Sequence, residues 1–176
     1  MSRIKPVDYD SLQAGKSKEM LDQIKSKLGK IPNIFKYMAV SPAVLGSYMG
    51  FSGALAQASI SPKVREQIAL AVAQENSCDY CLAAHTVMAK GAGLSDTQIA
   101  DSRKFTADDT KTGAIIKFAQ KLSKDRANVT DMDVKRVREA GLSDAEIIEV
   151  VAVVSLNIFT NYFNHVVDPE IDFPKV

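Results

Sequence analysis

One short run of the chain, Glu75-Asn-Ser-Cys78-Asp-Tyr-Cys81-Leu-Ala-Ala-His85, contains both cysteines and one of the two histidines. Asn76 or Ser77 can cap a helix that runs from about residue 78 to residue 90, which would place both cysteines in its first turn. Spacings of i, i+3 and i+4 then bring the two thiols and the imidazole to one helix face. The positive end of the helix dipole and a nearby histidine both favour thiolate over thiol. The run is therefore a candidate dithiol/disulfide switch.

Three other interpretations of the cysteines compete with a redox pair. Both could be small buried hydrophobic residues. They could bind zinc with His85, but a structural zinc site needs four ligands and His165 is the only other histidine. A purely structural disulfide would close a loop too short to constrain the unfolded chain much. Closely spaced cysteines in a reducing compartment more often serve redox chemistry, which is the interpretation we favour.

A reactive thiol needs a group that accepts and returns its proton. His85 is the first candidate, and Glu66 and Glu75 are the nearby carboxylates, for which a solvated surface position is the alternative. Tyr80 lies between the cysteines and could extend the relay through its hydroxyl or simply pack as an aromatic side chain. The helix dipole favours ionisation of the first cysteine, whereas His85 at i+4 favours the second as the activated sulfur, Cys81.

The composition excludes several functional classes. The 176 residues carry 22 basic and 21 acidic side chains, so the chain shows no electrostatic footprint for nucleic acid or an anionic membrane. The N-terminal segment has no apolar core of a secretion signal, and Glu149 interrupts the longest apolar stretch, 147–159. We therefore expect no membrane span and a cytoplasmic location.

Apolar spacing and capping residues predict helices nearly everywhere, over about 17–28, 33–39, 42–58, 62–74, 78–90, 96–102, 108–124, 130–140 and 143–165. With no alternating strand pattern, the expected fold is all-α, a compact helical bundle forming one domain over 1–176. Within it we expect a CxxC-containing core over about 42–104 and a Cys-free helical half over about 108–166. Three identities at an offset of 80 residues are compatible with an internal two-fold helical repeat: Glu66/Glu146, Ile68/Ile148 and His85/His165.

The pattern Glu75-x2-Cys78-x2-Cys81-x3-His85, with Glu66 twelve residues before the first cysteine, resembles the alkylhydroperoxidase AhpD core of the AhpD-like, carboxymuconolactone decarboxylase superfamily. The stretches 29–35, 41–42 and 161–174 resemble its peroxidase-related branch. This resemblance implies an all-α homo-oligomer with a dithiol that reduces a small peroxide or a protein disulfide. It implies no tightly bound cofactor or metal, and an external dithiol as the electron donor.

The resemblance also implies a role for each site residue. Cys81 corresponds to the reactive cysteine, Cys78 to the resolving one, Glu66 to the family glutamate and His85 to its distal histidine. Tyr80 stands where AhpD has a second histidine, and a phenol with a pKa near 10 cannot exchange protons at neutral pH as imidazole does. The leading hypothesis is an antioxidant thiol oxidoreductase. The alternatives are a non-catalytic redox sensor and a carboxymuconolactone decarboxylase-like enzyme, a branch that generally lacks the CxxC pair.

The last predicted helix is apolar nearly all round, so it must be covered on several sides, and we predict a homo-oligomer. Its apolar residues are Ile147, Ile148, Val150, Val151, Val153, Val154, Ile158, Phe159, Tyr162 and Phe163. Light scattering at micromolar concentration should give a mass that is a multiple of 19.1 kDa. A particle with the mass of one chain would contradict the prediction.

Overall fold

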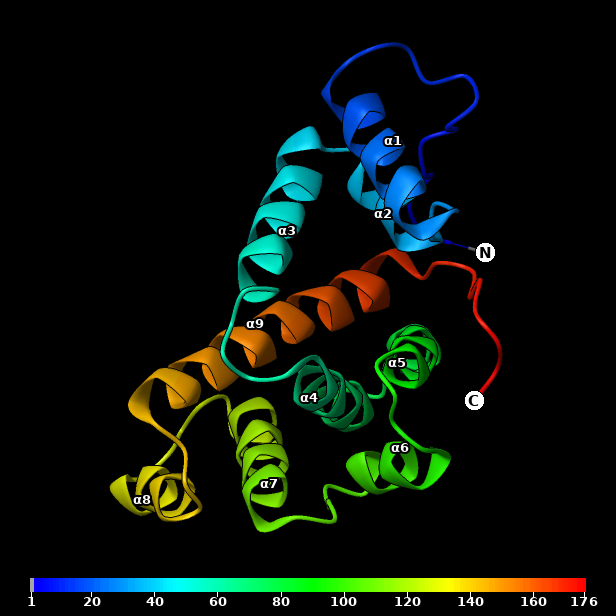
Figure 1. Cartoon of the computed structure of the whole chain (residues 1–176). Coiled ribbons are helices and arrows are strands. Elements are labelled where there is room, and N and C mark those ends of the chain that lie inside the picture. Colours follow the sequence, from blue (N-terminus) through cyan, green and yellow to red (C-terminus); the bar gives the residue numbers. More distant parts are fainter. Residues whose placement is uncertain (1) are drawn as a thin grey trace.

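The computed structural model describes residues 2–176, which form nine α-helices and no β-strand (Figure 1), confirming the all-α class. The helices are α1 (Lys16–Leu28), α2 (Asn33–Met38), α3 (Pro42–Leu55), α4 (Pro62–Glu75), α5 (Asp79–Gly91), α6 (Asp96–Arg103), α7 (Thr110–Lys124), α8 (Asp131–Glu139) and α9 (Asp144–Val167). Their ends agree with the predicted ones to within a few residues, the largest difference being α3, which ends three residues early.

Helix α4 lies at the centre of the bundle and contacts α5, α6, α7 and α9. Seven consecutive residues, 67–73, are buried, as expected for a helix that is covered on all sides. Leu70 and Ala73 belong to a core cluster that also contains both cysteines, while Ile68 and Val72 belong to a second cluster with α7 and α9. Because α4 joins both clusters, it fixes the position of the α5 N-terminus relative to α9.

The junction between α4 and α5 differs from the predicted one. Asn76 ends α4, and Ser77 takes a left-handed backbone conformation with φ of 53°. The N-cap of α5 is therefore Cys78, whose Sγ accepts a hydrogen bond from the Cys81 backbone N–H at 3.3 Å. The prediction that Asn76 or Ser77 caps this helix was wrong, because the left-handed turn at Ser77 delays the helix start to Asp79.

The proposed internal repeat has no structural counterpart. Glu66 and His85 lie on two helices, α4 and α5, separated by the turn at residues 76–78. The residues at the offset of 80, Glu146 and His165, both lie on the single continuous helix α9. The identities therefore reflect similar apolar helix patterns rather than a repeated helical unit.

Helix α9 crosses the whole molecule and contacts α3, α4, α5 and α7 (Figure 1). By length and composition it would be long and apolar enough to cross a membrane, contrary to the sequence-based expectation. Its buried side nevertheless carries polar side chains, which the other helices cover, as in the core helix of a bundle: Asn157, Thr160, Asn161 and Asn164. Several large apolar residues stay exposed along it, including Ile148, Tyr162 and Val166. That exposed side is the surface on which the predicted oligomer depends.

The start of α9 is held by a capping box between Ser143 and Glu146, and Glu146 also pairs with Lys111 of α7 at 2.7 Å. The Lys111 ammonium and the Ser143 backbone N–H lower the pKa of Glu146 from 4.5 to about 2. A lowered pKa contributes stability above pH 4.5, and this contribution disappears as the pH falls through about 2.

We therefore predict that Glu146→Gln, which can still accept the Ser143 hydrogen bond, lowers the free energy of unfolding by about 1–2 kcal/mol at pH 7. Urea denaturation should show this difference shrinking below pH 4.5 and vanishing near pH 2. Asp144→Asn is the matched control, because its pair with Arg138 is exposed to solvent and should contribute less than about 1 kcal/mol. A loss of stability that does not depend on pH would contradict this explanation.

Candidate active site

The two cysteines form a disulfide at the N-terminus of α5, with their Cα atoms 5.3 Å apart. Both are buried, with exposed fractions of 2% for Cys78 and 3% for Cys81. The structure thus brings the predicted pair together as an oxidised dithiol. Among residues 2–176, no group of three or more histidine, cysteine or acidic side chains is arranged to hold a metal ion.

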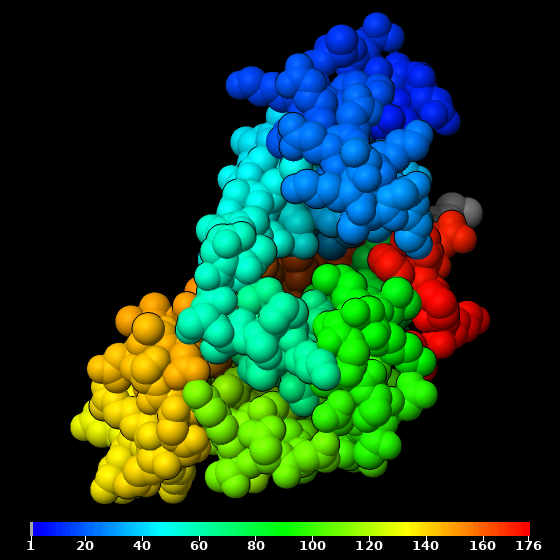
Figure 2. Space-filling model, viewed as in Figure 1, coloured from blue at the N-terminus to red at the C-terminus, as the bar shows by residue number. Residues whose placement is uncertain are grey.

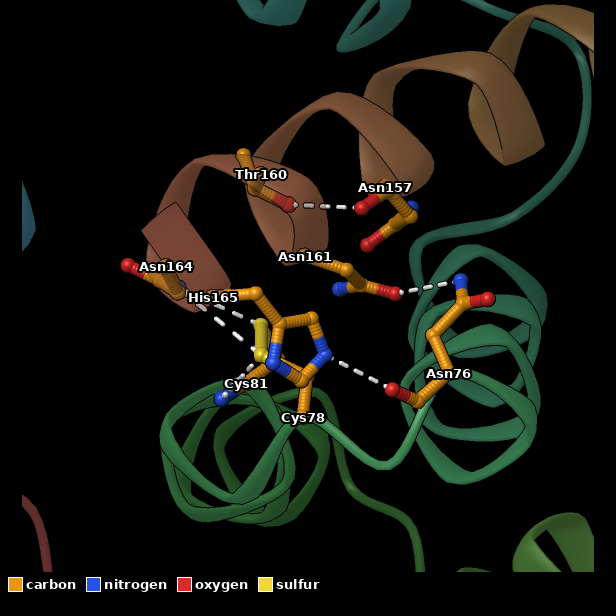
Figure 3. The surroundings of a disulfide bond; sticks show 8 residues. All are labelled: Asn76, Cys78, Cys81, Asn157, Thr160, Asn161, Asn164 and His165. Carbon is orange, nitrogen blue, oxygen red and sulfur yellow. Dashed lines mark hydrogen bonds between the residues drawn. A yellow bond between two sulfur atoms is a disulfide. The ribbon is translucent and has the colours of Figure 1, made fainter. Parts of the chain in front are cut away.

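The nearest polar side chain to the disulfide comes from the far end of the chain. Asn164 on α9 places its amide Nδ2 3.2 Å from the Cys81 Sγ and 3.9 Å from the Cys78 Sγ (Figure 3). Sequence reasoning did not identify this residue. A signal was present, since Asn157, Asn161 and Asn164 place amides along one side of an otherwise apolar helix.

Two residues near Asn164, Asn161 and His165, attach α9 to the junction between α4 and α5. The Asn161 Oδ1 accepts a hydrogen bond from the Asn76 Nδ2 at 2.9 Å, and the His165 Nε2 lies 2.7 Å from the Asn76 carbonyl oxygen (Figure 3). His165 is exposed to solvent and lies against the junction between α4 and α5. The second histidine of the chain thus serves as an anchor between α9 and the turn that precedes Cys78.

Glu66 and His85 form a close pair between α4 and α5, with 2.8 Å between the Glu66 Oε2 and the His85 Nδ1. Both side chains are largely buried. Within residues 2–176 no hydrogen bond joins His85 to either sulfur. In this oxidised form the sulfur is bonded to Cys78, and His85 Nδ1 faces the carboxylate instead.

The other candidate carboxylate, Glu75, does not take part in this pair. Its Oε2 accepts a hydrogen bond at 2.9 Å from the Gln120 Nε2 on α7. Both Glu66 and Glu75 are half-buried rather than fully solvated, but only Glu66 lies against the histidine. The structure therefore distinguishes the two candidate glutamates: Glu66 contacts His85, whereas Glu75 contacts Gln120.

A cavity of about 220 Å³ lies beside the Glu66–His85 pair, between α3, α4, α5 and α9. Figure 2 shows it as a hollow between α3 and α5, with α9 visible at its base. The remaining wall is mostly apolar and includes Met88 and Leu156, with the phenol of Tyr48 on the α3 side. Burial raises the pKa of Tyr48, so this phenol stays protonated at neutral pH and can act as a donor.

Tyr80 does not extend the relay towards the cysteines. Its hydroxyl donates to the Asp172 Oδ1 at 2.8 Å and accepts from the Ile34 backbone N–H at 3.2 Å. Its ring packs edge-on against Phe173, and burial strongly raises its pKa. These contacts engage the hydroxyl with α2 and the C-terminal segment rather than with His85, so no contact of Tyr80 in this structure supports the expected catalytic role.

We therefore predict that Tyr80→Phe lowers the free energy of unfolding by about 1–2 kcal/mol, because it leaves the buried Ile34 N–H without its partner. The rate at which the reduced cysteines react with peroxide should stay within about twofold of wild type, since the hydroxyl bonds to Asp172 and Ile34 and not to His85. Denaturation curves and stopped-flow oxidation measure the two effects. A slowing as large as that of His85→Ala would restore Tyr80 to the relay.

Comparison with known proteins agrees with this arrangement. Residues 42–122 match the model of the carboxymuconolactone decarboxylase family. No curated protein matches the chain.

Several solved structures share the fold. One is an AhpD-core, uncharacterised peroxidase-related protein from Ralstonia eutropha JMP134, with a TM-score of 0.87 and 21% identity over 97% of this chain and 92% of that one. A peroxidase-related protein from Silicibacter sp. TM1040 has a TM-score of 0.81 and 21% identity over 97% of each chain. A variant of the debrominase Bmp8 in complex with 2,3,4-tribromopyrrole has a TM-score of 0.82 and 19% identity over 98% of this chain and 94% of that one.

The structural likeness alone establishes the fold, and the family-model match covers the disulfide, Glu66 and His85. The predicted resemblance is therefore confirmed at the level of the superfamily. Residues 42–122 match the carboxymuconolactone decarboxylase family, within a chain whose fold is similar to that of the AhpD-core structure.

Proposed function

We propose that the protein is an antioxidant thiol oxidoreductase that reduces a small peroxide through the Cys78–Cys81 dithiol. The observation that carries this proposal is the disulfide at the N-terminus of α5, with His85 one helical turn further along the same helix and paired with Glu66 of α4. A reversible dithiol beside a proton-transfer pair has the parts that peroxide reduction requires.

In the proposed reaction, the Cys81 thiolate attacks one peroxide oxygen, so that a sulfur–oxygen bond forms and the oxygen–oxygen bond breaks. Protonated His85 gives its proton to the departing alkoxide or hydroxide, which leaves as alcohol or water. The Cys78 thiol then attacks the Cys81 sulfenic acid, which forms the disulfide and releases water. An external dithiol returns two electrons and two protons, and the predicted cytoplasmic location would supply such a reductant.

Glu66 is proposed to orient the histidine and to support its charged form. If the His85 Nδ1 donates to the Glu66 carboxylate, the Nε2 is left to exchange a proton during the reaction. The carboxylate lies 2.8 Å from the ring, so it faces the positive charge that His85 carries after it accepts the thiol proton. The pair can therefore act as both acceptor and donor.

The burial of the sulfurs favours a small oxidant over a protein disulfide. Exposed fractions of 2% and 3% leave no surface for a bulky disulfide to approach in line with either sulfur. The cavity of about 220 Å³, which is lined by Glu66 and His85 and not by the cysteines, has room for a compact molecule only. The Bmp8 likeness makes a brominated pyrrole a useful third substrate to test, because a dithiol could also supply the two electrons for debromination.

The test is stopped-flow oxidation of the reduced protein by hydrogen peroxide, an organic hydroperoxide, a protein disulfide and a bromopyrrole. We expect fast oxidation by a peroxide and repeated turnover once a dithiol donor is added. Oxidation without turnover would instead support a redox sensor. Decarboxylation of a muconolactone by a protein whose cysteines are both replaced would support the decarboxylase alternative.

Substitutions of the two cysteines should separate their roles. Cys81→Ser should abolish the reaction with peroxide, whereas Cys78→Ser should allow the first oxidation and stop at a sulfenic acid that dimedone traps. Mass spectrometry measures both outcomes. The reverse result would show that Cys78 is the attacking sulfur.

Substitutions of the proton-transfer pair should slow the first oxidation. His85→Ala should reduce its rate by about 100-fold, because the proton-transfer group is lost, and Glu66→Gln should reduce it by a smaller factor, because His85 loses the carboxylate that orients it. Glu75→Gln is the matched control on the same helix, since its carboxylate is bonded to Gln120, and it should react as wild type does. Equal effects of the two glutamate variants would contradict the proposed relay.

A further inference from the structure

We propose that Asn164 is a positioning residue that stabilises the thiolate of Cys81. Its side chain is 5% exposed, and its Nδ2 lies 3.2 Å from the Cys81 Sγ and 3.9 Å from the Cys78 Sγ. Its Oδ1 is buried and makes no hydrogen bond with any residue of 2–176. The two sulfurs are thus the hydrogen-bond partners of this buried amide.

Packing alone does not explain an asparagine at this position. A buried amide is unfavourable unless both its oxygen and its nitrogen are bonded, and here the oxygen has no partner. The nitrogen faces disulfide sulfurs, which are weak acceptors. The contact becomes stronger when a sulfur acquires negative charge, because hydrogen bonds to charged groups are the strong ones. Asn164 therefore favours the reduced, ionised form of the dithiol.

The position of Asn164 also decides which sulfur carries the charge. The Cys81 backbone N–H donates to the Cys78 Sγ, so the N-terminus of α5 by itself favours a thiolate at Cys78. Asn164 lies closer to Cys81 and supplies the side-chain donor on that side. In the oxidised structure His85 makes no such contact, since its Nδ1 faces Glu66. Asn164 is therefore the group that moves negative charge to the sulfur that attacks in the proposed function.

The residues beside Asn164 hold it over the disulfide. Asn161, one turn earlier, bonds to the Asn76 side chain, and His165 bonds to the Asn76 carbonyl. Both contacts attach the last turns of α9 to the junction directly before Cys78. This explains the Asn161-x2-Asn164-His165 run, of which two members anchor the helix and one contacts the sulfurs.

The test measures thiol pKa values and uses no peroxide. In a Cys78→Ser background, Asn164→Leu should raise the pKa of the Cys81 thiol by about one, a tenfold loss of thiolate, read from the thiolate absorbance against pH. In a Cys81→Ser background, the same change should raise the pKa of Cys78 by less than half as much. With both cysteines present, the equilibrium with glutathione should move about tenfold towards the disulfide.

Asn157→Leu is the matched control, because it removes another buried amide of α9, which is bonded to the Val153 carbonyl. It should leave both thiol pKa values unchanged. Circular dichroism monitors folding, and Asn164→Ala, a smaller replacement, provides a second reading of the same shift. An unchanged Cys81 pKa in a folded variant, or a larger shift at Cys78, would overturn the inference.

The inference rests on the dithiol of the proposed function but can fail separately from it. If the pKa shifts occur and no peroxide turns over, the proposed function is wrong and the role of Asn164 stands. If peroxide turns over and Asn164→Leu changes neither pKa, the role of Asn164 is wrong and the proposed function stands.

Discussion

The contact between the last turns of α9 and the turn joining α4 to α5 is the constraint on which the site depends. Asn76 is central to it, because its side-chain Nδ2 donates to Asn161, its carbonyl oxygen bonds to His165 and its Oδ1 accepts from Ser123 of α7. Burying several amides is unfavourable unless they bond to one another. These hydrogen bonds therefore hold the junction in one position. Because Cys78 follows the junction directly, they also fix the position of the disulfide.

That fixed position divides the site into two parts with different chemistry. On one side are the two sulfurs and their hydrogen-bond donors. The Cys81 backbone N–H donates to the Cys78 Sγ, and the Asn164 side-chain amide donates to the Cys81 Sγ. On the other side is the Glu66–His85 pair, which faces a small apolar cavity. In the proposed function, the first part stabilises negative charge on sulfur and the second moves a proton. In the oxidised form the two parts make no hydrogen bond to each other, and the proposed function requires them to act together once the disulfide is reduced.

Tyr80 shows how a residue inside a redox motif can serve the fold instead. The side chain leaves the CxxC turn and meets the C-terminal segment, where Asp172 accepts from its hydroxyl and also from the Asn33 backbone N–H. The N-terminus of α2 and the end of the chain are thereby joined to the start of α5. This stabilises the turn that carries the cysteines without adding a proton-transfer group to it.

The sequence alone determined the helices, most of their caps and the local part of the site. Helices α4 and α9 begin within one residue of the predicted positions 62 and 143, with Ser61 and Ser143 as their caps, because capping and apolar spacing depend on residues within one or two turns. The pairing of Cys78 with Cys81 could be predicted in the same way, because it depends only on their spacing of three residues. Glu66 and Glu75 were both candidates from the sequence, the family resemblance favoured Glu66, and the structure places Glu66 against His85.

Only the tertiary structure decided the rest. The left-handed turn at Ser77, which makes Cys78 the helix cap, forms where α4 must end for α5 to pack against it, and no local pattern specified it. The direction of Tyr80 depends on Asp172, and the donor to Cys81 comes from Asn164, 83 residues away. Hydrogen bonds across such separations form only after the helices have packed. Helix propensity and spacing are local and cannot specify which buried side chains will meet.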